Sequence, residues 1–131
     1  MARLTIRIDL GENLAFGPGK AQLLELIENT GSIRQAAIEM DMSYRRAWLL
    51  LRETEAMAKM PVVTAQTGGK KGGGTTLTPS GRALVECYRM IEKQAERSTL
   101  SQLHKLVEMT KRDIKEAGGS RKHARGRMRN G

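Results

Sequence analysis

The spacing between two predicted helices is the feature that most constrains the fold of this chain. Ser32 and Ser43 each precede a segment of apolar residues at helical spacing, so each serine is suited to cap a helix. Only Asp41 and Met42 remain as the turn between them, and helices joined so closely must cross steeply. Asp41 occupies the turn position where glycine is common, because the backbone there is often left-handed; aspartate is among the few other residues that tolerate this conformation. A steep crossing needs small residues where the two backbones approach, and Ala36, Ala37 and Ala47 are available there. The segment 32–57 is therefore predicted to form a helix-turn-helix.

The flanking segments predict strands and two further helices. Alternating apolar residues favour a strand over 3–10, and a helix with one apolar face follows and ends at Gly31. The β-prone segments on either side of the glycine-rich loop 67–74 predict a hairpin, which beside a helix-turn-helix is a wing. A long helix then begins with Thr78 as its cap and Pro79 in its first turn. The expected fold is mainly α with a small β component: a winged helix-turn-helix with a long C-terminal dimerisation helix.

The long helix carries an apolar stripe. A domain of this size offers too few core residues to cover it. After Ala95 the stripe resumes in a shifted phase at Leu100, which predicts a bend or a new helix near Ser98 and Thr99. We expect the stripe to pack on a second copy of the chain, as a homodimer. The residues predicted for this interface are Leu4, Leu84, Tyr88, Ile91 and Ala95.

The net charge of +9 favours a polyanionic partner. The segment 118–131 holds five arginines and lysines and no acid, so only +4 belongs to residues 1–117. Proteins that bind single-stranded nucleic acid stack its bases on aromatic side chains, and this chain has only four aromatic residues. Double-stranded DNA is therefore the expected partner. The expected organisation is a DNA-binding domain over 1–80, a helical dimerisation segment over 81–117 and a disordered basic tail over 118–131.

The candidate contacts to DNA centre on the second helix of the helix-turn-helix. A recognition helix presents residues near its N-terminus to base edges, so Ser43, Tyr44, Arg45 and Arg46 are expected in the major groove. Arg45 and Arg46 are the candidates for base contacts there, and the Tyr44 hydroxyl is suited to donate to a phosphate. Lys70 and Lys71 of the wing are expected on the DNA backbone or in the minor groove. Trp48 is expected to pack in the core. For all of these residues an ordinary solvated surface is the alternative interpretation. The full set of predicted contacts is Arg34, Ser43, Tyr44, Arg45, Arg46, Leu49, Thr67, Lys70 and Lys71.

Other kinds of site find little support in the sequence. Cys87 is the single cysteine, so no intrachain disulfide forms, and it is expected as a small buried core residue. His104 and His123 stand far from each other and from the cysteine, without metal-ligand spacing. The glycine-rich segments lack a Gly-Lys-Ser or Gly-Lys-Thr, and no catalytic set has a recognisable spacing, so no cofactor, metal or enzymatic activity is expected. Without an apolar stretch long enough for a signal peptide or a membrane span, a cytoplasmic protein with no membrane partner is expected.

Three segments of the sequence resemble one family. Ser-Tyr-Arg-Arg-Ala-Trp at 43–48, the glycine-rich loop 67–74 and Leu-Thr-Pro-Ser-Gly at 77–81 are similar to the N-terminal DNA-binding domain of the ModE-type, molybdate-responsive bacterial regulators, a LysR-like winged helix. The resemblance is strong over 19–88 and implies a transcriptional regulator that binds DNA as a dimer and is linked to molybdate transport or metabolism. Family members that sense molybdate carry C-terminal Mop-type repeats. No such repeat follows within these 131 residues, so no small-molecule effector is expected to bind this chain directly.

Two other functions remain open on the sequence alone. A non-specific nucleoid- or RNA-associated protein would bind without sequence preference and would depend on residues 118–131. A protein-interaction module built on a winged helix would not bind DNA at all. A salt titration distinguishes these cases, because contacts to phosphates make the affinity fall steeply with salt.

Overall fold

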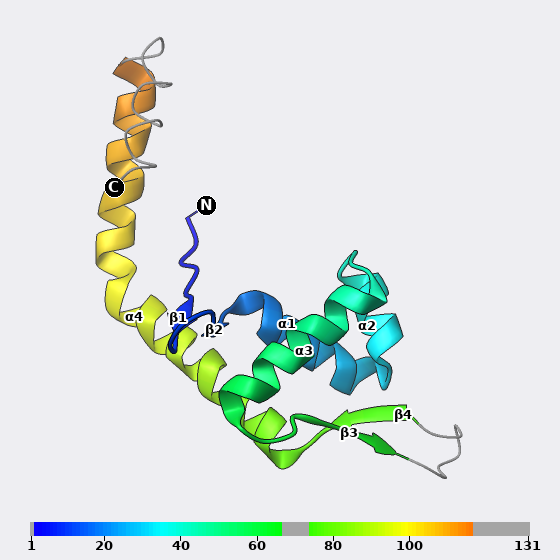
Figure 1. Cartoon of the computed structure of the whole chain (residues 1–131). Helices are drawn as coiled ribbons and strands as arrows, with labels where there is room; N and C mark the ends of the chain where they lie inside the picture. The colour runs from blue at the N-terminus through cyan, green and yellow to red at the C-terminus, as the bar shows by residue number, and fades with distance from the viewer. Residues whose placement is uncertain (1, 67–73, 117–131) are drawn as a thin grey trace. The chain divides into compact units, whose positions relative to one another are not determined.

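The computed structural model describes residues 2–66 and 74–116 of the chain, with side chains as far as Lys111. It contains two compact units, one formed by Thr5–Lys93 and one by the two ends of the chain, Met1–Leu4 and Gln94–Gly131. The described elements, in chain order, are β1 (Ile8–Asp9), β2 (Ala15–Phe16), α1 (Pro18–Thr30), α2 (Ile33–Glu39), α3 (Tyr44–Ala58), β3 (Val63–Gln66), β4 (Gly74–Leu77) and α4 (Pro79–Glu116) (Figure 1). The prediction of a mainly α winged helix-turn-helix with a long C-terminal helix is confirmed.

The helix-turn-helix of α2 and α3 forms as the spacing of the two serines predicts. The Ser32 hydroxyl accepts the Gln35 N–H at 2.9 Å, and the Ser43 hydroxyl accepts the Arg46 N–H at 3.0 Å. Each bond satisfies one of the amides that the first turn of a helix leaves free. Asp41 adopts the left-handed conformation in the turn, with a φ of 58°. The alanines at the crossing are at most 1% exposed: Ala36, Ala37 and Ala47.

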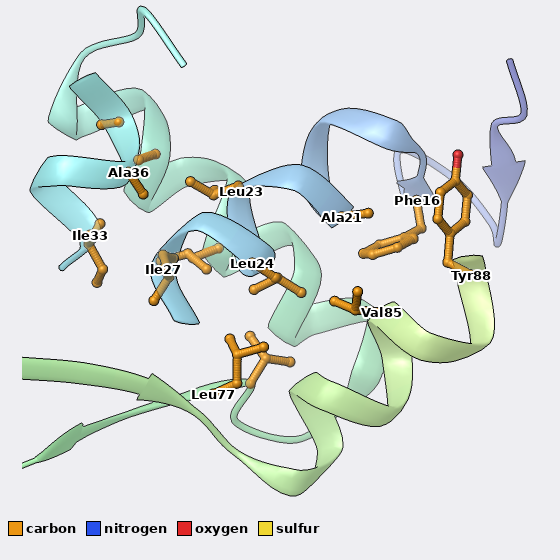
Figure 2. Close-up of a cluster of buried hydrophobic side chains, with 14 residues drawn as sticks. Phe16, Ala21, Leu23, Leu24, Ile27, Ile33, Ala36, Leu77, Val85 and Tyr88 are labelled. Atoms are coloured by element: carbon orange, nitrogen blue, oxygen red, sulfur yellow. The ribbon is translucent and has the colours of Figure 1, made fainter. Parts of the chain in front are cut away.

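The core of the first unit lies between α1, α2, α3, the base of the wing and the first turns of α4 (Figure 2). The residues of α1 that enter it are Ala21, Leu23, Leu24 and Ile27. This helix ends at Gly31, whose φ of 74° is a left-handed conformation that glycine adopts without the steric cost of a β-carbon. At the other end of the core, the rings of Phe16 and Tyr88 pack edge to face with centres 5.3 Å apart. The Tyr88 hydroxyl donates to the carbonyl of Ile6 at 2.7 Å, so the N-terminal segment is tied to α4.

The wing pairs β3 with β4 as an antiparallel hairpin, with Val63 opposite Leu77. Its base approaches the first turn of α4 very closely. A β-carbon placed on Gly81 would collide with the carbonyl oxygen of Val62, the residue before β3. That same carbonyl accepts the Thr78 N–H at 3.0 Å. Backbone atoms therefore fix the wing against the start of α4.

The first strand is much shorter than the sequence pattern predicts. Only Ile8 and Asp9 pair with β2, because β2 itself offers two residues before α1 begins. Leu4, Ile6 and Ile8 are partly buried, in keeping with the alternation, whereas Leu10 is 54% exposed. The prediction of a strand over 3–10 is therefore wrong in its length.

The expectations about α4 are met only in part. One helix continues past Ser98 and Thr99, so the alternative of a new helix there is wrong, whereas the alternative of a bend stays a prediction. The Thr99 hydroxyl donates to the carbonyl of Ala95 at 2.7 Å within the helix. Cys87 is exposed instead of buried, because Val85 and Tyr88 occupy the face of α4 that is turned to the core.

Candidate nucleic-acid interface

The first turn of α3 presents a basic, exposed surface. Arg45 and Arg46 are both exposed, and this turn contains no acidic residue. The helix is held in this orientation by its opposite face, where Ala47, Leu51 and Thr54 are at most 1% exposed. Because the free amides of a helix N-terminus and nearby arginines both attract phosphate, this turn is chemically suited to a polyanion.

Trp48 lies on the surface, so the prediction that it packs in the core is wrong. Its side chain is 40% exposed, because Ala47 and Leu51 take the inward positions and leave Trp48 on an outer face of α3. Tyr44, one turn earlier, is 41% exposed, and the two rings meet edge to face with centres 6.2 Å apart. Leu49 is 47% exposed. The surface of α3 is therefore apolar as well as basic.

Arg34 of α2 joins this surface through Tyr44. The guanidinium carbon of Arg34 lies 4.4 Å from the centre of the Tyr44 ring, within the range of a cation–π contact. Arg34 of α2 and Tyr44 of α3 therefore lie side by side on the surface of the helix-turn-helix. The remaining predicted contacts Thr67, Lys70 and Lys71 fall in the segment 67–73, which lies outside the described residues.

An open hollow of about 780 Å³ separates α3 from the wing. Its lining comes from the α1–α2 junction, from α3 and from both wing strands, and includes Arg34, Tyr44, Trp48, Val63, Ala65 and Thr75. The wing is attached to the helix-turn-helix at the edge of this hollow, where the Thr75 N–H donates to the carbonyl of Gly31 at 2.9 Å. Backbone atoms of Gly31 and Thr75 therefore close this edge of the hollow.

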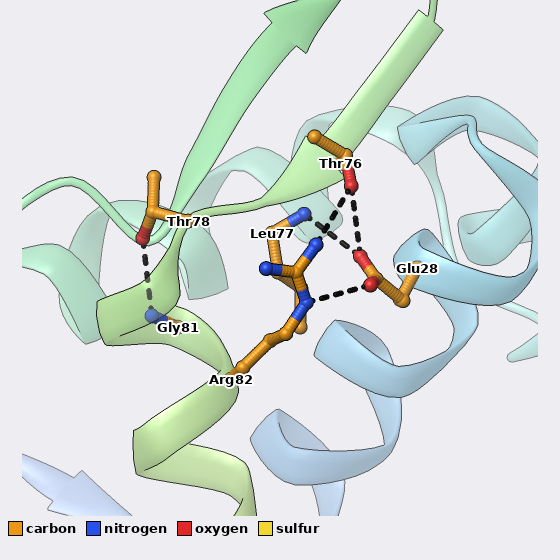
Figure 3. Close-up of polar contacts among 6 residues, drawn as sticks. All are labelled: Glu28, Thr76, Leu77, Thr78, Gly81 and Arg82. Atoms are coloured by element: carbon orange, nitrogen blue, oxygen red, sulfur yellow. Dashed lines mark hydrogen bonds and ion pairs between the residues drawn. The ribbon is translucent and has the colours of Figure 1, made fainter.

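Glu28 of α1 holds the base of the wing through several polar contacts (Figure 3). One carboxylate oxygen accepts the Thr76 hydroxyl and the Leu77 N–H, each at 2.9 Å, and the other accepts the Arg82 Nε–H at 2.8 Å. These donors stabilise the ionised form and hold the pKa of Glu28 below its ordinary value, with the Leu77 N–H as the largest cause. This role could not be predicted from the sequence, because Glu28 is one of several polar residues of α1 and its partners are about 50 residues away.

A second ion-paired group connects α1 to α4 within the first unit. Both terminal carboxylate oxygens of Glu25 accept from Arg89, at 3.0 Å from Nε and 2.7 Å from Nη2, while Arg89 Nη1 donates to Glu92 at 2.7 Å. These bonds raise the pKa of Arg89 above its ordinary value. Bidentate arginine–carboxylate pairs restrict geometry as well as supply energy, so this pair fixes the first part of α4 against α1.

We expect the substitution Glu28→Gln to lower the free energy of unfolding by about 1 kcal/mol at pH 7, because bonds to a carboxylate become bonds to a neutral amide. Folding lowers the pKa of Glu28. The difference in free energy of unfolding between the wild-type chain and the variant is therefore complete above the ordinary pKa of 4.5, and it is lost as the pH falls through the pKa of the folded state. Urea denaturation at a series of pH values measures this. Glu86→Gln, at an exposed position of α4, is the control; an equal and pH-independent effect of both substitutions would contradict the role of Glu28.

The residues predicted for a dimer interface are divided between the two units. In the unit Thr5–Lys93, Tyr88 is only 2% exposed within its own chain, Leu84 is partly buried and Ile91 is 38% exposed. Leu4 and Ala95, both partly buried, belong to the other unit. Further apolar residues of α4 are more than half exposed: Met90, Leu100, Leu106 and Met109. Their exposure is what an interface would require, and the interface itself stays a prediction.

Over residues 2–66 and 74–111, no three histidine, cysteine, aspartate or glutamate side chains gather as metal ligands would. None of the helices described combines the length and the apolar character needed to cross a membrane.

Comparison with known proteins identifies relatives of this chain. No protein-family model matches it. It is 38% identical over 115 residues to the molybdenum transport protein ModE of Azotobacter vinelandii, which is 87% of this chain and 42% of that protein. It is 44% identical over 77 residues to the molybdenum-pterin-binding protein MopB of Rhodobacter capsulatus, which is 59% of this chain and 28% of that protein. With the DNA-binding transcriptional dual regulator ModE of Escherichia coli it shares 33% identity over 90 residues, 69% of this chain and 34% of the regulator.

The family resemblance inferred from the sequence is therefore confirmed, over a limited region. The matches cover less than half of the length of each of these relatives. Over the region that they share, the chain is a homologue of the ModE-type transcriptional regulators.

Proposed function

We propose that this chain binds double-stranded DNA through α3 and the wing and acts as the DNA-binding part of a transcriptional regulator. The observation that carries the proposal is the exposed first turn of α3, where Arg45 and Arg46 stand without an acidic neighbour on a helix-turn-helix flanked by a wing. The relatives support it, since several are named as transcriptional regulators. Arginine at the start of a recognition helix is suited to the O6 and N7 atoms of guanine.

The other predicted contacts are assigned to the DNA backbone. Tyr44 and Arg34 lie on the same side of the unit as the first turn of α3, and the sequence places Lys70 and Lys71 in the wing loop. Five bases in residues 118–131 add affinity that does not depend on sequence, because each neutralised phosphate releases a counterion. In this proposal, the affinity is supplied by many basic residues and the specificity by a few on α3.

Selection of bound sequences from a pool of random duplexes tests the proposal most directly. A specific regulator is expected to enrich one motif, with two-fold symmetry if the chain binds as a dimer. Retention of duplexes without any enriched motif, together with loss of binding when residues 118–131 are removed, would instead favour a non-specific nucleoid- or RNA-associated protein. No retention at low salt would contradict DNA binding altogether.

The homodimer is a separate part of the proposal and has its own prediction. We expect the chain to sediment as a dimer at tens of micromolar, and Ile91→Glu to shift it toward monomer, because a carboxylate would be buried at the interface. Lys93→Glu places the same charge two residues further along, at an exposed position outside the predicted interface, and is expected to leave the dimer intact. A monomeric wild-type chain would contradict the dimer.

The connection with molybdenum comes from the relatives alone. Two of them are named molybdenum transport proteins. We therefore propose genes of molybdenum transport as targets. The enriched motif from the selection experiment tests this when it is compared with the promoters of such genes in the source genome.

A further inference from the structure

The four aromatic residues of this chain form two pairs with opposite environments. Phe16 and Tyr88, each 2% exposed, make an edge-to-face pair in the core. Tyr44 and Trp48 make a similar pair on the surface of α3, where they are 41% and 40% exposed. Half of the aromatic residues are thus kept partly in water, at a cost in hydrophobic free energy. Tyrosine and tryptophan are enriched at interfaces, so an exposed pair of these rings is a candidate contact for a ligand.

The surface pair faces the hollow between α3 and the wing. Tyr44 and Trp48 line it from α3, and Val63, Ala65 and Thr75 line it from the wing. The pairing of Ala65 with Thr75 and of Val63 with Leu77 places these three wing residues on one face of the hairpin. An occupant of the hollow therefore meets aromatic rings on one side and small side chains on the other.

The charges around the hollow favour an anionic occupant. Among the described residues that line the hollow, Arg34 is the single base and Glu55 the single acid, and a carboxylate oxygen of Glu55 accepts the Val62 N–H at 2.9 Å. Arg45 and Arg46 add positive charge at the first turn of α3. A sugar–phosphate strand matches this combination, because the deoxyribose offers an apolar surface and the phosphates are negatively charged.

We infer that one sugar–phosphate strand of duplex DNA lies in this hollow, with Tyr44 and Trp48 packed against deoxyribose and Arg34 paired with a phosphate. The inference rests on the proposed DNA binding and specifies its backbone site. Contacts to sugar and phosphate fix the position of a protein on DNA without reading its sequence. Trp48 is therefore a positioning contact, in contrast to the base contacts proposed for Arg45 and Arg46.

Trp48 is the single tryptophan of the chain, so its fluorescence tests the inference in the unaltered protein. Labelled duplex, followed by fluorescence anisotropy, reports binding independently. When saturating duplex is added, we expect the Trp48 emission to change and its quenching by acrylamide to fall several-fold. Binding of duplex with unchanged emission and unchanged quenching would overturn the inference while leaving DNA binding intact. Absence of any binding would overturn both.

Substitutions provide a second test. Trp48→Ala is expected to weaken binding roughly tenfold, and by the same factor on a duplex selected by the wild-type chain and on a scrambled duplex. Trp48→Phe is expected to recover part of the loss, because it restores an aromatic ring. Ile38→Ala is the matched control: Ile38 is 61% exposed on α2, does not line the hollow, and its loss is expected to leave the affinity unchanged. Wild-type affinity of Trp48→Ala on both duplexes, or a loss confined to the selected duplex, would overturn the backbone assignment.

Discussion

Replacement of Gly81 by alanine is expected to destabilise the folded chain by about 3 kcal/mol, at the upper end of the range for overpacking a rigid site. A β-carbon at this position would overlap the carbonyl oxygen of Val62 and crowd its β-carbon. Neither neighbour can move freely, since the Val62 carbonyl accepts the Thr78 N–H and Val62 itself is fully buried. The strain therefore falls on the junction between the wing and α4.

Gly19 offers a matched control for this substitution. Like Gly81, it lies in the first turn of a helix that begins with proline, but no atom stands within 4 Å of a β-carbon built there. Gly19→Ala is expected to be neutral or to stabilise the chain by up to about 1 kcal/mol, because alanine loses less backbone entropy in a helix. Urea denaturation followed by circular dichroism measures both variants. Equal midpoints for the two would contradict the close approach at Gly81.

Arg45→Ala and Arg46→Ala are each expected to weaken binding to a selected duplex by roughly 1–3 kcal/mol, the range for one base contact. Binding to a scrambled duplex is expected to change little. Both side chains are exposed and distant from the buried face of α3, so the variants should fold normally. Competition titrations with the two duplexes, at one fixed salt concentration, give the two affinities.

Arg52 provides the control for charge alone. It is exposed on the same helix, about two turns beyond Arg45, where a recognition helix has moved away from the bases. Arg52→Ala is expected to cause a smaller loss that is similar on both duplexes. If Arg45→Ala and Arg46→Ala behaved in the same way, they would be phosphate contacts, and the proposed reading of bases by α3 would be wrong.

The features of the fold that the sequence predicted are those set by neighbouring residues. The capping serines, the left-handed Asp41 and the helix end at Gly31 each depend on a few adjacent positions, and all were found as expected. The exposure of Trp48 was missed because helical spacing alone does not decide which of several apolar faces turns inward. In α3 that choice is made by the contact of Ala47 with the other helices, which Trp48 would be too large to make.

Contacts between residues far apart in the chain could not be predicted from sequence patterns. Glu28 meets Thr76 and Arg82 across separations of 48 and 54 residues, and no periodicity records such a meeting. The same holds for the hollow, which needs the wing and α3 to be placed together. Two residues that line the hollow, Tyr44 on α3 and Arg34 on α2, are nevertheless among the contacts that the sequence predicts, because their chemistry suits a phosphate.

The bond between the Thr75 N–H and the Gly31 carbonyl has a consequence for the thermodynamics of binding. Because main-chain atoms make it, the distance between the wing and the helix-turn-helix does not depend on which side chains line the space between them. Substitutions in the lining should then alter the enthalpy of association while adding little ordering entropy, since the walls are already preorganised. Variants at Trp48 or Ala65 can therefore be compared as changes of surface chemistry at constant geometry.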